Sequence, residues 1–179
     1  MMFEGTSNNR SFDKVLASSG GDSNAFTSPD VTNYYQSLPS ACIETAFALE
    51  ADRMSSLSLE EKPFDIQKKV VIEEFKQRYL TQPYGDVWHV LRDFCYPGSS
   101  YKWPTIGKSV SGIELLSSCD LRDFYDKYYV PNNAHLVVGG SHSDEEVFDL
   151  ANRYFSPLGK GNVPLLSFRE SQWQGRSLL

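Results

Sequence analysis

The sequence has no long hydrophobic run and few cysteines. No apolar stretch approaches the roughly 20 residues that a membrane-spanning helix requires, and residues 1–10 show neither the basic start nor the apolar core of a signal peptide. The three cysteines, Cys42, Cys95 and Cys119, are widely spaced and form no Cys-x-x-Cys pair. This pattern indicates neither a disulfide framework nor a sulfur-based zinc site. We therefore expect three reduced thiols packed in the core.

Basic residues are too few for a typical nucleic-acid-binding protein. Lys and Arg number 17 against 23 Asp and Glu, which gives a net charge of -6, and the charges are scattered. Binding of phosphates needs a basic stripe or patch, so nucleic acid is not an expected partner. The length of 179 residues, with 40% hydrophobic and 13% aromatic residues, instead suits one globular domain with a sizeable core.

Several common catalytic motifs are also missing. There is no Gly-x-Ser-x-Gly elbow and no glycine-rich phosphate loop. A catalytic zinc site normally takes three protein ligands, usually including histidine, but His89, His135 and His142 lie far apart in the sequence. The stretch from His142 to Glu146 is similar to a truncated His-x-x-Glu-His, yet its fifth residue is glutamate. Capping of a helix by Ser143 and Glu146 explains this stretch more simply.

Apolar residues recur at helical spacing in several segments. Residues 40–57 and 64–80 show the longest such patterns, and shorter ones are bounded by capping residues. We expect Asp86 and Ser118 to cap two of the shorter helices, and Ser143 with Glu146 to form a capping box. The helices are predicted at residues 11–18, 40–57, 64–80, 86–94, 118–128 and 143–154.

Two segments predict β-structure instead. Residues 23–38 alternate and are rich in Thr, Tyr and Phe, with a turn signal at Ser28-Pro29-Asp30, so they predict two antiparallel strands. Residues 134–140 form a continuous apolar run, which is typical of a strand buried on both faces. Strands and helices interleave, so the fold class is α/β or α+β. We expect residues 1–160 to form the domain and residues 161–179 to be a linker or the start of a following segment.

Glu74 is the most informative acidic residue. On the helix predicted at residues 64–80, Gln67, Val70, Val71 and Glu74 lie along one stripe. A carboxylate among apolar neighbours needs a partner or a metal. The alternative is a surface glutamate paired with Arg78. The strand at residues 23–28 offers a second feature, because a strand at a sheet edge can pair with an extended peptide; the alternative there is an ordinary internal strand.

Taken in order, several short motifs point to one family. Residues 24–28, Asn-Ala-Phe-Thr-Ser, and residues 69–74, which end in Glu73-Glu74, are the most informative of them. The chain resembles the N-terminal domain of the pitrilysin or insulinase-type (M16) zinc metallopeptidases, beginning just after their His-x-x-Glu-His motif. The resemblance covers nearly the whole chain and rests on residues 1–6, 24–28, 34–35, 49–54, 69–74, 103–107 and 131–134.

This resemblance implies a metal site and a substrate strand. Glu74 would be the distal zinc ligand, with Gln67 at a supporting position where the family usually has glutamate. Asn24, Ala25 and Phe26 would lie on the strand that holds the substrate backbone.

The resemblance places the catalytic residues outside this sequence. Both histidine ligands and the general base belong to the missing motif, which would lie upstream of Met1, so no catalytic residue is expected within the chain. The implied fold is a mixed, largely antiparallel sheet packed with helices, of α+β sandwich type, without its first strands and motif helix.

The same resemblance implies a function and partners. We expect a fragment of a zinc-dependent endopeptidase that hydrolyses extended peptides, inactive by itself and completed by a second homologous half or subunit. Zinc is the expected cofactor of the full-length enzyme, and self-association through uncovered apolar surface is expected of this chain. The alternative is a non-catalytic homologue that binds peptides or completes a partner.

Overall fold

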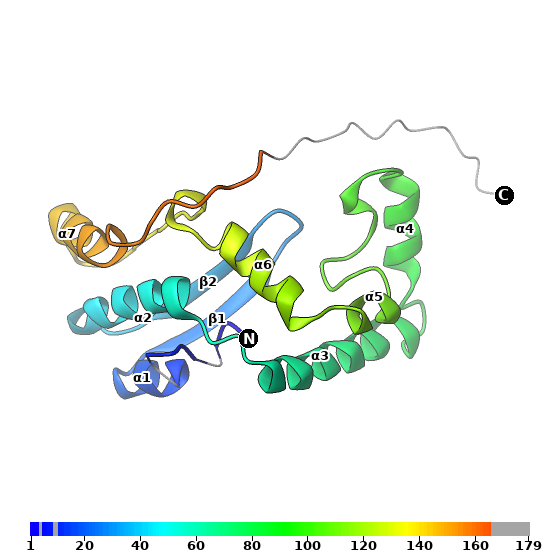
Figure 1. Ribbon diagram of the computed structural model, residues 1–179, viewed down its shortest axis with the longest axis horizontal. Helices are drawn as coiled ribbons and strands as arrows, with labels where there is room; N and C mark the ends of the chain where they lie inside the picture. Colours follow the sequence, from blue (N-terminus) through cyan, green and yellow to red (C-terminus); the bar gives the residue numbers. More distant parts are fainter. Residues whose placement is uncertain (4, 9–10, 166–179) are drawn as a thin grey trace. The chain divides into compact units, whose positions relative to one another are not determined.

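The computed structural model describes residues 1–3, 5–8 and 11–165 (Figure 1). The chain divides into two compact units, and each is described by itself. Of the described chain, the first unit contains residues 1–26, 33–64 and 117–164, and the second contains residues 27–32, 65–116 and 165. None of the described helices has the length and hydrophobicity needed to cross a bilayer.

The first unit combines helices with a small hairpin. Its helices are α1 (Phe12–Ser18), α2 (Ile43–Ser56), α6 (Ser118–Tyr128) and α7 (Asp144–Phe155), and its strands are β1 (Asp22–Thr27) and β2 (Thr32–Ser37). Single 3₁₀ turns precede α2 at Ser40–Cys42 and follow α6 at Pro131–Asn133. The strands form a two-stranded sheet. The hairpin and the helices predicted here are confirmed, to within a few residues at their ends.

Two hydrophobic clusters hold the first unit. In one, Phe12 and Leu16 of α1 pack on Leu49 of α2, and all three side chains are buried. In the other, Leu57 and Leu59, which follow α2, pack on Tyr125 of α6. Burying a side chain of this size stabilises a fold by about 1.5–3 kcal/mol. The clusters therefore fix α1, α2 and α6 within the first unit.

The second unit is helical. It contains most of α3 (Glu61–Phe75), the π-helical turn η2 (Lys76–Leu80), α4 (Val87–Cys95), a 3₁₀ turn (Ser100–Lys102) and α5 (Val110–Glu114). Its core is formed by Ile72 and Phe75 of α3 with Ile113 of α5. Helix α5 was not predicted from the sequence.

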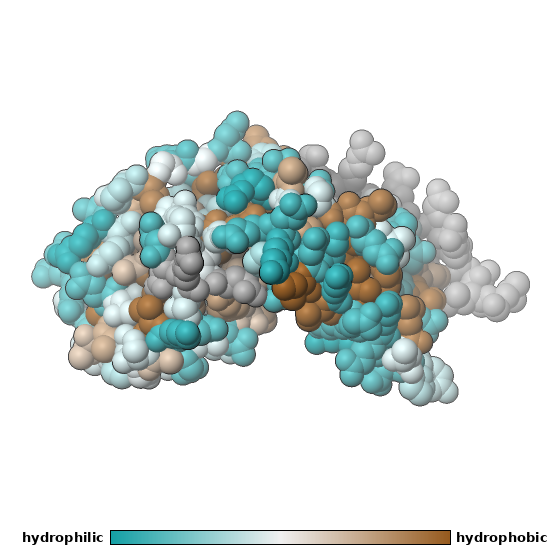
Figure 2. Space-filling model, turned by 60° about the horizontal axis from the view of Figure 1, so that its bottom comes forward, coloured by the Kyte–Doolittle hydropathy of each residue, from teal (hydrophilic) through white to brown (hydrophobic). Residues whose placement is uncertain are grey.

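Much apolar surface of the second unit is exposed. No residue of α4 is buried, and Val87, Trp88, Val90 and Leu91 are exposed. In Figure 2, hydrophobic residues are gathered on the visible face of this unit. Exposed apolar patches of this kind mark interaction surfaces.

The strand predicted at residues 134–140 is wrong. Residues 134–139 belong to no helix or strand, and Val137 is 89% exposed. A β-strand needs a neighbour to accept its hydrogen bonds, and no described strand pairs with this segment. The apolar composition predicted a buried strand, but a pairing partner cannot be seen in the local sequence.

Two capping predictions and one prediction about cysteines are corrected. Ser117, rather than Ser118, caps α6, because its hydroxyl accepts from Asp120 N at 3.2 Å and Asp120 Oδ2 accepts from Ser117 N at 2.8 Å. Asp86 precedes α4 but makes no side-chain cap hydrogen bond. The thiols are free as expected, but Cys95 and Cys119 are exposed rather than in the core.

Candidate functional site

Strand β1 presents alternate residues to its two faces. Asn24 and Phe26 are exposed, whereas Ser23 and Ala25 are half-buried on the inner face. The exposed fraction of Phe26 is 58%. Of the three residues expected to hold a peptide, two side chains therefore point outward, and Ala25 is turned toward the protein.

The backbone of Ala25 shows which edge of β1 is open. The Ala25 N–H donates to Oδ1 of Asn24 at 2.8 Å, so a neighbouring side chain accepts this proton. Only β2 pairs with β1 in the described sheet. In an antiparallel pair, alternate residues direct their N–H and C=O groups away from the partner strand. The Ala25 N–H thus lies at the free edge, where an extended chain could bind it.

Glu74 lies near the C-terminal end of α3, in the second unit. Its Oε1 is 2.9 Å from Nη2 of Arg78, and the side chains are 41% and 65% exposed, respectively. The surface ion pair that the sequence left open as the alternative is therefore present. Gln67, two turns earlier on α3, is half-buried.

The described residues do not by themselves form a zinc site. No group of three or more His, Cys, Asp or Glu side chains is close enough to hold a metal within the described residues. His89 packs edge-on against the ring of Tyr79, at 4.6 Å between centroids. His142 Nδ1 contacts Glu146 Oε2 at 2.9 Å, and His135 is exposed. His89 thus packs among aromatic rings and His142 pairs with Glu146, whereas His135 is exposed rather than part of the buried strand predicted from the sequence.

Met1 contributes to the packing of the first unit. Its side chain is half-buried and packs against the cluster of Leu57, Leu59 and Tyr125 in the first unit. A thioether is a flexible apolar group that fills gaps in a core.

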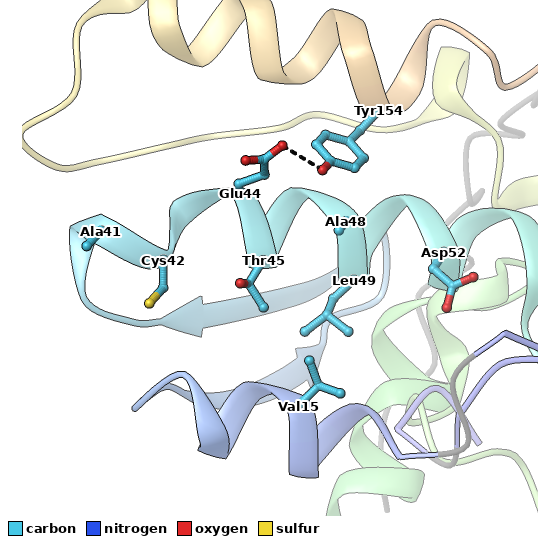
Figure 3. Close-up of a pocket in the computed structure, with 9 residues that line it drawn as sticks. All are labelled: Val15, Ala41, Cys42, Glu44, Thr45, Ala48, Leu49, Asp52 and Tyr154. Atoms are coloured by element: carbon cyan, nitrogen blue, oxygen red, sulfur yellow. Dashed lines mark hydrogen bonds between the residues drawn. The ribbon is translucent and has the colours of Figure 1, made fainter.

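A pocket of about 560 Å³ lies along α2, which sits between α1 and α7 (Figure 3). Both of its carboxylates are already engaged. Glu44 accepts from Tyr154 Oη and Arg153 Nη1, each at 2.8 Å, and these hydrogen bonds lower its pKa. The lining residues are Val15, Ala41, Cys42, Glu44, Thr45, Ala48, Leu49, Asp52 and Tyr154.

Asp52, the second carboxylate of the pocket, ties the N-terminal segment to α2. It accepts hydrogen bonds from Thr6 Oγ1, from Asn8 Nδ2 at 2.6 Å and from Ser56 Oγ at 2.5 Å. Burial opposes ionisation of Asp52, but the hydrogen bonds from Ser56, Thr6 and Asn8 outweigh it and lower the pKa. The two carboxylates of this pocket thus hold the N-terminal segment and α7 against α2.

Sequence reasoning missed Arg53, which is 2% exposed. On the helix at residues 40–57 an arginine is expected to face solvent. The available signal was Glu50, three residues earlier, which is at the spacing of a helical ion pair.

Comparisons with known proteins agree on one family. A family model described as Insulinase (Peptidase family M16) matches residues 1–83, and a second, described as Peptidase M16 inactive domain, matches residues 116–176.

Among curated relatives, the zinc protease PqqE of Helicobacter pylori is 33% identical over 147 residues, which is 82% of this chain and 33% of that protein. The uncharacterized zinc protease YmxG of Bacillus subtilis is 29% identical over 91% of this chain and 40% of its own length. Subunit 1 of the bovine (Bos taurus) cytochrome b-c1 complex is 26% identical over 93% of this chain and 36% of its own length. The chain thus spans one third to two fifths of these relatives.

Solved structures share the fold. The crystal structure of a protease from Helicobacter pylori aligns with a TM-score of 0.84 and 31% identity, over 96% of this chain and 41% of that chain. The first half of the periplasmic protease PqqL from Escherichia coli aligns with a TM-score of 0.81 and 20% identity, over 96% of this chain and 38% of that chain. The α/β class expected from the sequence is therefore confirmed.

Proposed function

This chain belongs to the insulinase family of peptidases, family M16, and we propose that it supplies the peptide-binding strand and one metal ligand of a zinc endopeptidase. Its substrate would be an extended peptide or an unstructured protein segment. The relatives named as zinc proteases support this class of reaction.

The free edge of β1 is the observation that carries the proposal. An extended peptide that pairs with β1 would replace the Asn24 side chain as the acceptor for the Ala25 N–H. Backbone pairing of this kind gives affinity with little dependence on peptide sequence. The exposed ring of Phe26 would add an apolar contact on the outer face of the strand.

Glu74 is proposed as the metal ligand of the chain. An exposed ion pair with Arg78 is weak, so a zinc ion with further ligands could displace it. Carboxylate oxygen is a regular zinc donor, but a catalytic site takes three protein ligands. We therefore propose that these 179 residues do not hydrolyse peptides by themselves and that a second M16 half or subunit completes the enzyme.

Binding of a peptide without zinc tests the proposal directly. We expect a fluorescently labelled, unstructured peptide to bind the chain, as measured by fluorescence anisotropy. Ala25→Pro removes the edge N–H without adding bulk to the outer face, and we expect it to weaken binding at least about tenfold. The matched control is Ser40→Pro, at the first position of a helical turn, where proline is tolerated. Equal peptide affinities for the two variants would mean that β1 is not the binding edge.

A peptidase assay tests the second part. With added zinc, the chain alone should release no cleaved peptide above a heat-denatured control. Turnover that EDTA abolishes and that Glu74→Gln lowers would overturn the proposed inactivity and would at the same time assign Glu74 to the metal.

A second candidate function is a non-catalytic M16 homologue that binds peptides or completes a partner. The Glu74–Arg78 pair favours it, because it neutralises the carboxylate without metal. So does Gln67, which stands where the resemblance calls for glutamate. This candidate also predicts peptide binding at β1, but it predicts no zinc-dependent activity in any assembly that contains the chain.

We also propose that the chain pairs with a second copy through residues 135–139. These residues belong to no helix or strand and make no backbone hydrogen bond to other described residues. No Asp, Glu, Lys or Arg occurs between Lys127 and Asp144, so two copies can approach here without repulsion between like charges. Antiparallel pairing centred on Val137 would place β-branched side chains opposite each other.

A further inference from the structure

Arg53 is an unusual residue for the interior of the first unit. It lies on α2, and only 2% of its surface is exposed. Its Nε donates to Oε2 of Glu50 at 3.2 Å, and its Nη2 donates to Oε1 of the same carboxylate. The guanidinium thus forms a bidentate pair with Glu50 through two parallel hydrogen bonds, and this arrangement fixes both side chains.

Three aromatic rings enclose the charge. The guanidinium carbon of Arg53 lies 4.6 Å from the ring centroids of Phe12 and Tyr34 and 5.3 Å from that of Phe3. Cations are attracted to ring faces at such distances, and the attraction is stronger away from water. These rings come from the N-terminal segment, α1 and β2, so one side chain joins three parts of the unit.

Arg53 and Glu50 also contact the inner face of β2. Gln36 Nε2 donates to Glu50 Oε1 at 2.6 Å. Tyr34, two residues earlier on the same face, stacks on Arg53, and its hydroxyl lies 2.7 Å from that of Tyr129. Burial, and then the hydrogen bond with Tyr129, raise the pKa of Tyr34, so this hydroxyl stays protonated. Both inward side chains of β2 are therefore held.

Stability alone does not explain an arginine at this position. Buried ion pairs can often be replaced by apolar side chains of similar volume without loss of stability. Their best-supported use is to select one arrangement among several. A hairpin of two strands is marginal by itself, and β1 pairs only with β2 in the described sheet. Whatever fixes β2 therefore fixes β1.

We infer that Arg53 is a positioning residue for the peptide edge: together with Glu50 it locks Tyr34 and Gln36 of β2, and through β2 it keeps β1 extended and ready to pair. The inference rests on the proposed function only in the use of β1 as the binding edge. Its structural part, that Arg53 fixes the hairpin, is independent of any ligand.

The test combines amide hydrogen exchange with peptide binding. Arg53→Met keeps most of the side chain's length but removes the charge. Arg53→Lys keeps the charge but cannot form the bidentate pair with Glu50. For Arg53→Met we expect exchange at the backbone amides of β1 to accelerate at least tenfold, with at least tenfold weaker binding of the labelled peptide. For Arg53→Lys we expect smaller changes in both the exchange rates and the peptide affinity. In both variants the exchange rates of the α7 amides should stay unchanged.

Two further variants guard against loss of folding. Gln36→Leu cuts a single link between β2 and Glu50 and should give a smaller change in the same direction. Ser37→Ala, at an exposed position of β2, is the matched control and should behave as the unmodified chain. If Arg53→Met does not fold, Arg53→Lys and Gln36→Leu decide by the same two measurements.

The outcomes separate the two claims. Unchanged exchange in β1 together with unchanged peptide affinity, in folded variants that lack the arginine or Gln36, overturns the positioning role. If the unmodified chain binds no peptide, the proposed function fails, and faster exchange confined to the hairpin still supports Arg53 as the residue that fixes it. Faster exchange spread equally over α7 would mean a general structural role and would overturn the inference.

Discussion

The carboxylate of Glu74 lies 2.9 Å from the guanidinium of Arg78, at the junction of α3 and η2. Both side chains are substantially exposed. An exposed pair at this spacing contributes about 0.3–0.5 kcal/mol to stability. The pair therefore neutralises Glu74 in the chain but holds its carboxylate only weakly.

The first prediction follows from this weak coupling. We expect Arg78→Ala to lower the free energy of unfolding by no more than about 0.5 kcal/mol, as measured by urea denaturation. Lys76→Ala is the matched control, because Lys76 forms a similarly exposed pair with Glu73 on the same turn. A loss well above that of the control would make the Glu74–Arg78 pair structural and would weaken the case for Glu74 as a metal ligand.

The second prediction concerns acid stability. Because the pKa of Asp52 is lowered in the folded chain, its ionised form stabilises the fold above the carboxylate's unfolded pKa of about 3.9, and this contribution is lost as pH falls through the lower folded value. Asp52→Asn should therefore reduce stability at neutral pH and flatten the acid limb of a plot of unfolding free energy against pH. Asp123→Asn, at an exposed position of α6, should leave that limb unchanged. A parallel shift of the whole curve in Asp52→Asn would contradict the assignment.

The third prediction is self-association. Sedimentation velocity over a range of concentrations should show a monomer–dimer equilibrium for the unmodified chain. Val137→Lys places two like charges opposite each other in the proposed pairing and should give a monomer. Phe148→Lys removes a side chain on α7 that is 72% exposed but lies outside the segment, and it should still dimerise. The proposal is abandoned if the unmodified chain is monomeric at its solubility limit or if the two variants behave alike.

The fourth prediction separates two neighbouring serines. Ser117→Ala removes the side chain that caps α6 and should cost about 1 kcal/mol in unfolding free energy. Ser118→Ala changes the first helical residue and should cost little, because alanine is a good helix former. Equal costs for the two substitutions would mean that the capping box of Ser117 and Asp120 contributes no stability.

Local sequence signals predicted the elements whose causes are local. The turn at Ser28-Pro29 and the alternation around it gave the hairpin, and helical spacing gave α2, α3 and α7 with small errors at their ends. The prediction for α6 placed the cap one residue late, because Ser117 and Ser118 are both good capping residues and only geometry separates them.

Features that depend on distant contacts were out of reach. Residues 134–140 have a strand's composition, but pairing is decided by neighbours that composition cannot supply. Arg53 looks like a solvent-facing helix residue until Phe12 and Tyr34 are known to lie beside it. Of the candidate site, the sequence predicted β1 and Glu74 through the family resemblance. It could not reveal that the Asn24 side chain accepts a hydrogen bond from the Ala25 N–H or that Arg78 forms an ion pair with Glu74.

The exposed thiols give the two compact units separate chemical handles. Cys95 belongs to the second unit and Cys119 to the first. After Cys42→Ser, each unit carries a single thiol, and the rate of alkylation of each thiol can be followed by mass spectrometry. With increasing urea, the two rates would report the opening of each unit separately. The cooperativity of unfolding between the units thereby becomes a quantity read from two labelling curves.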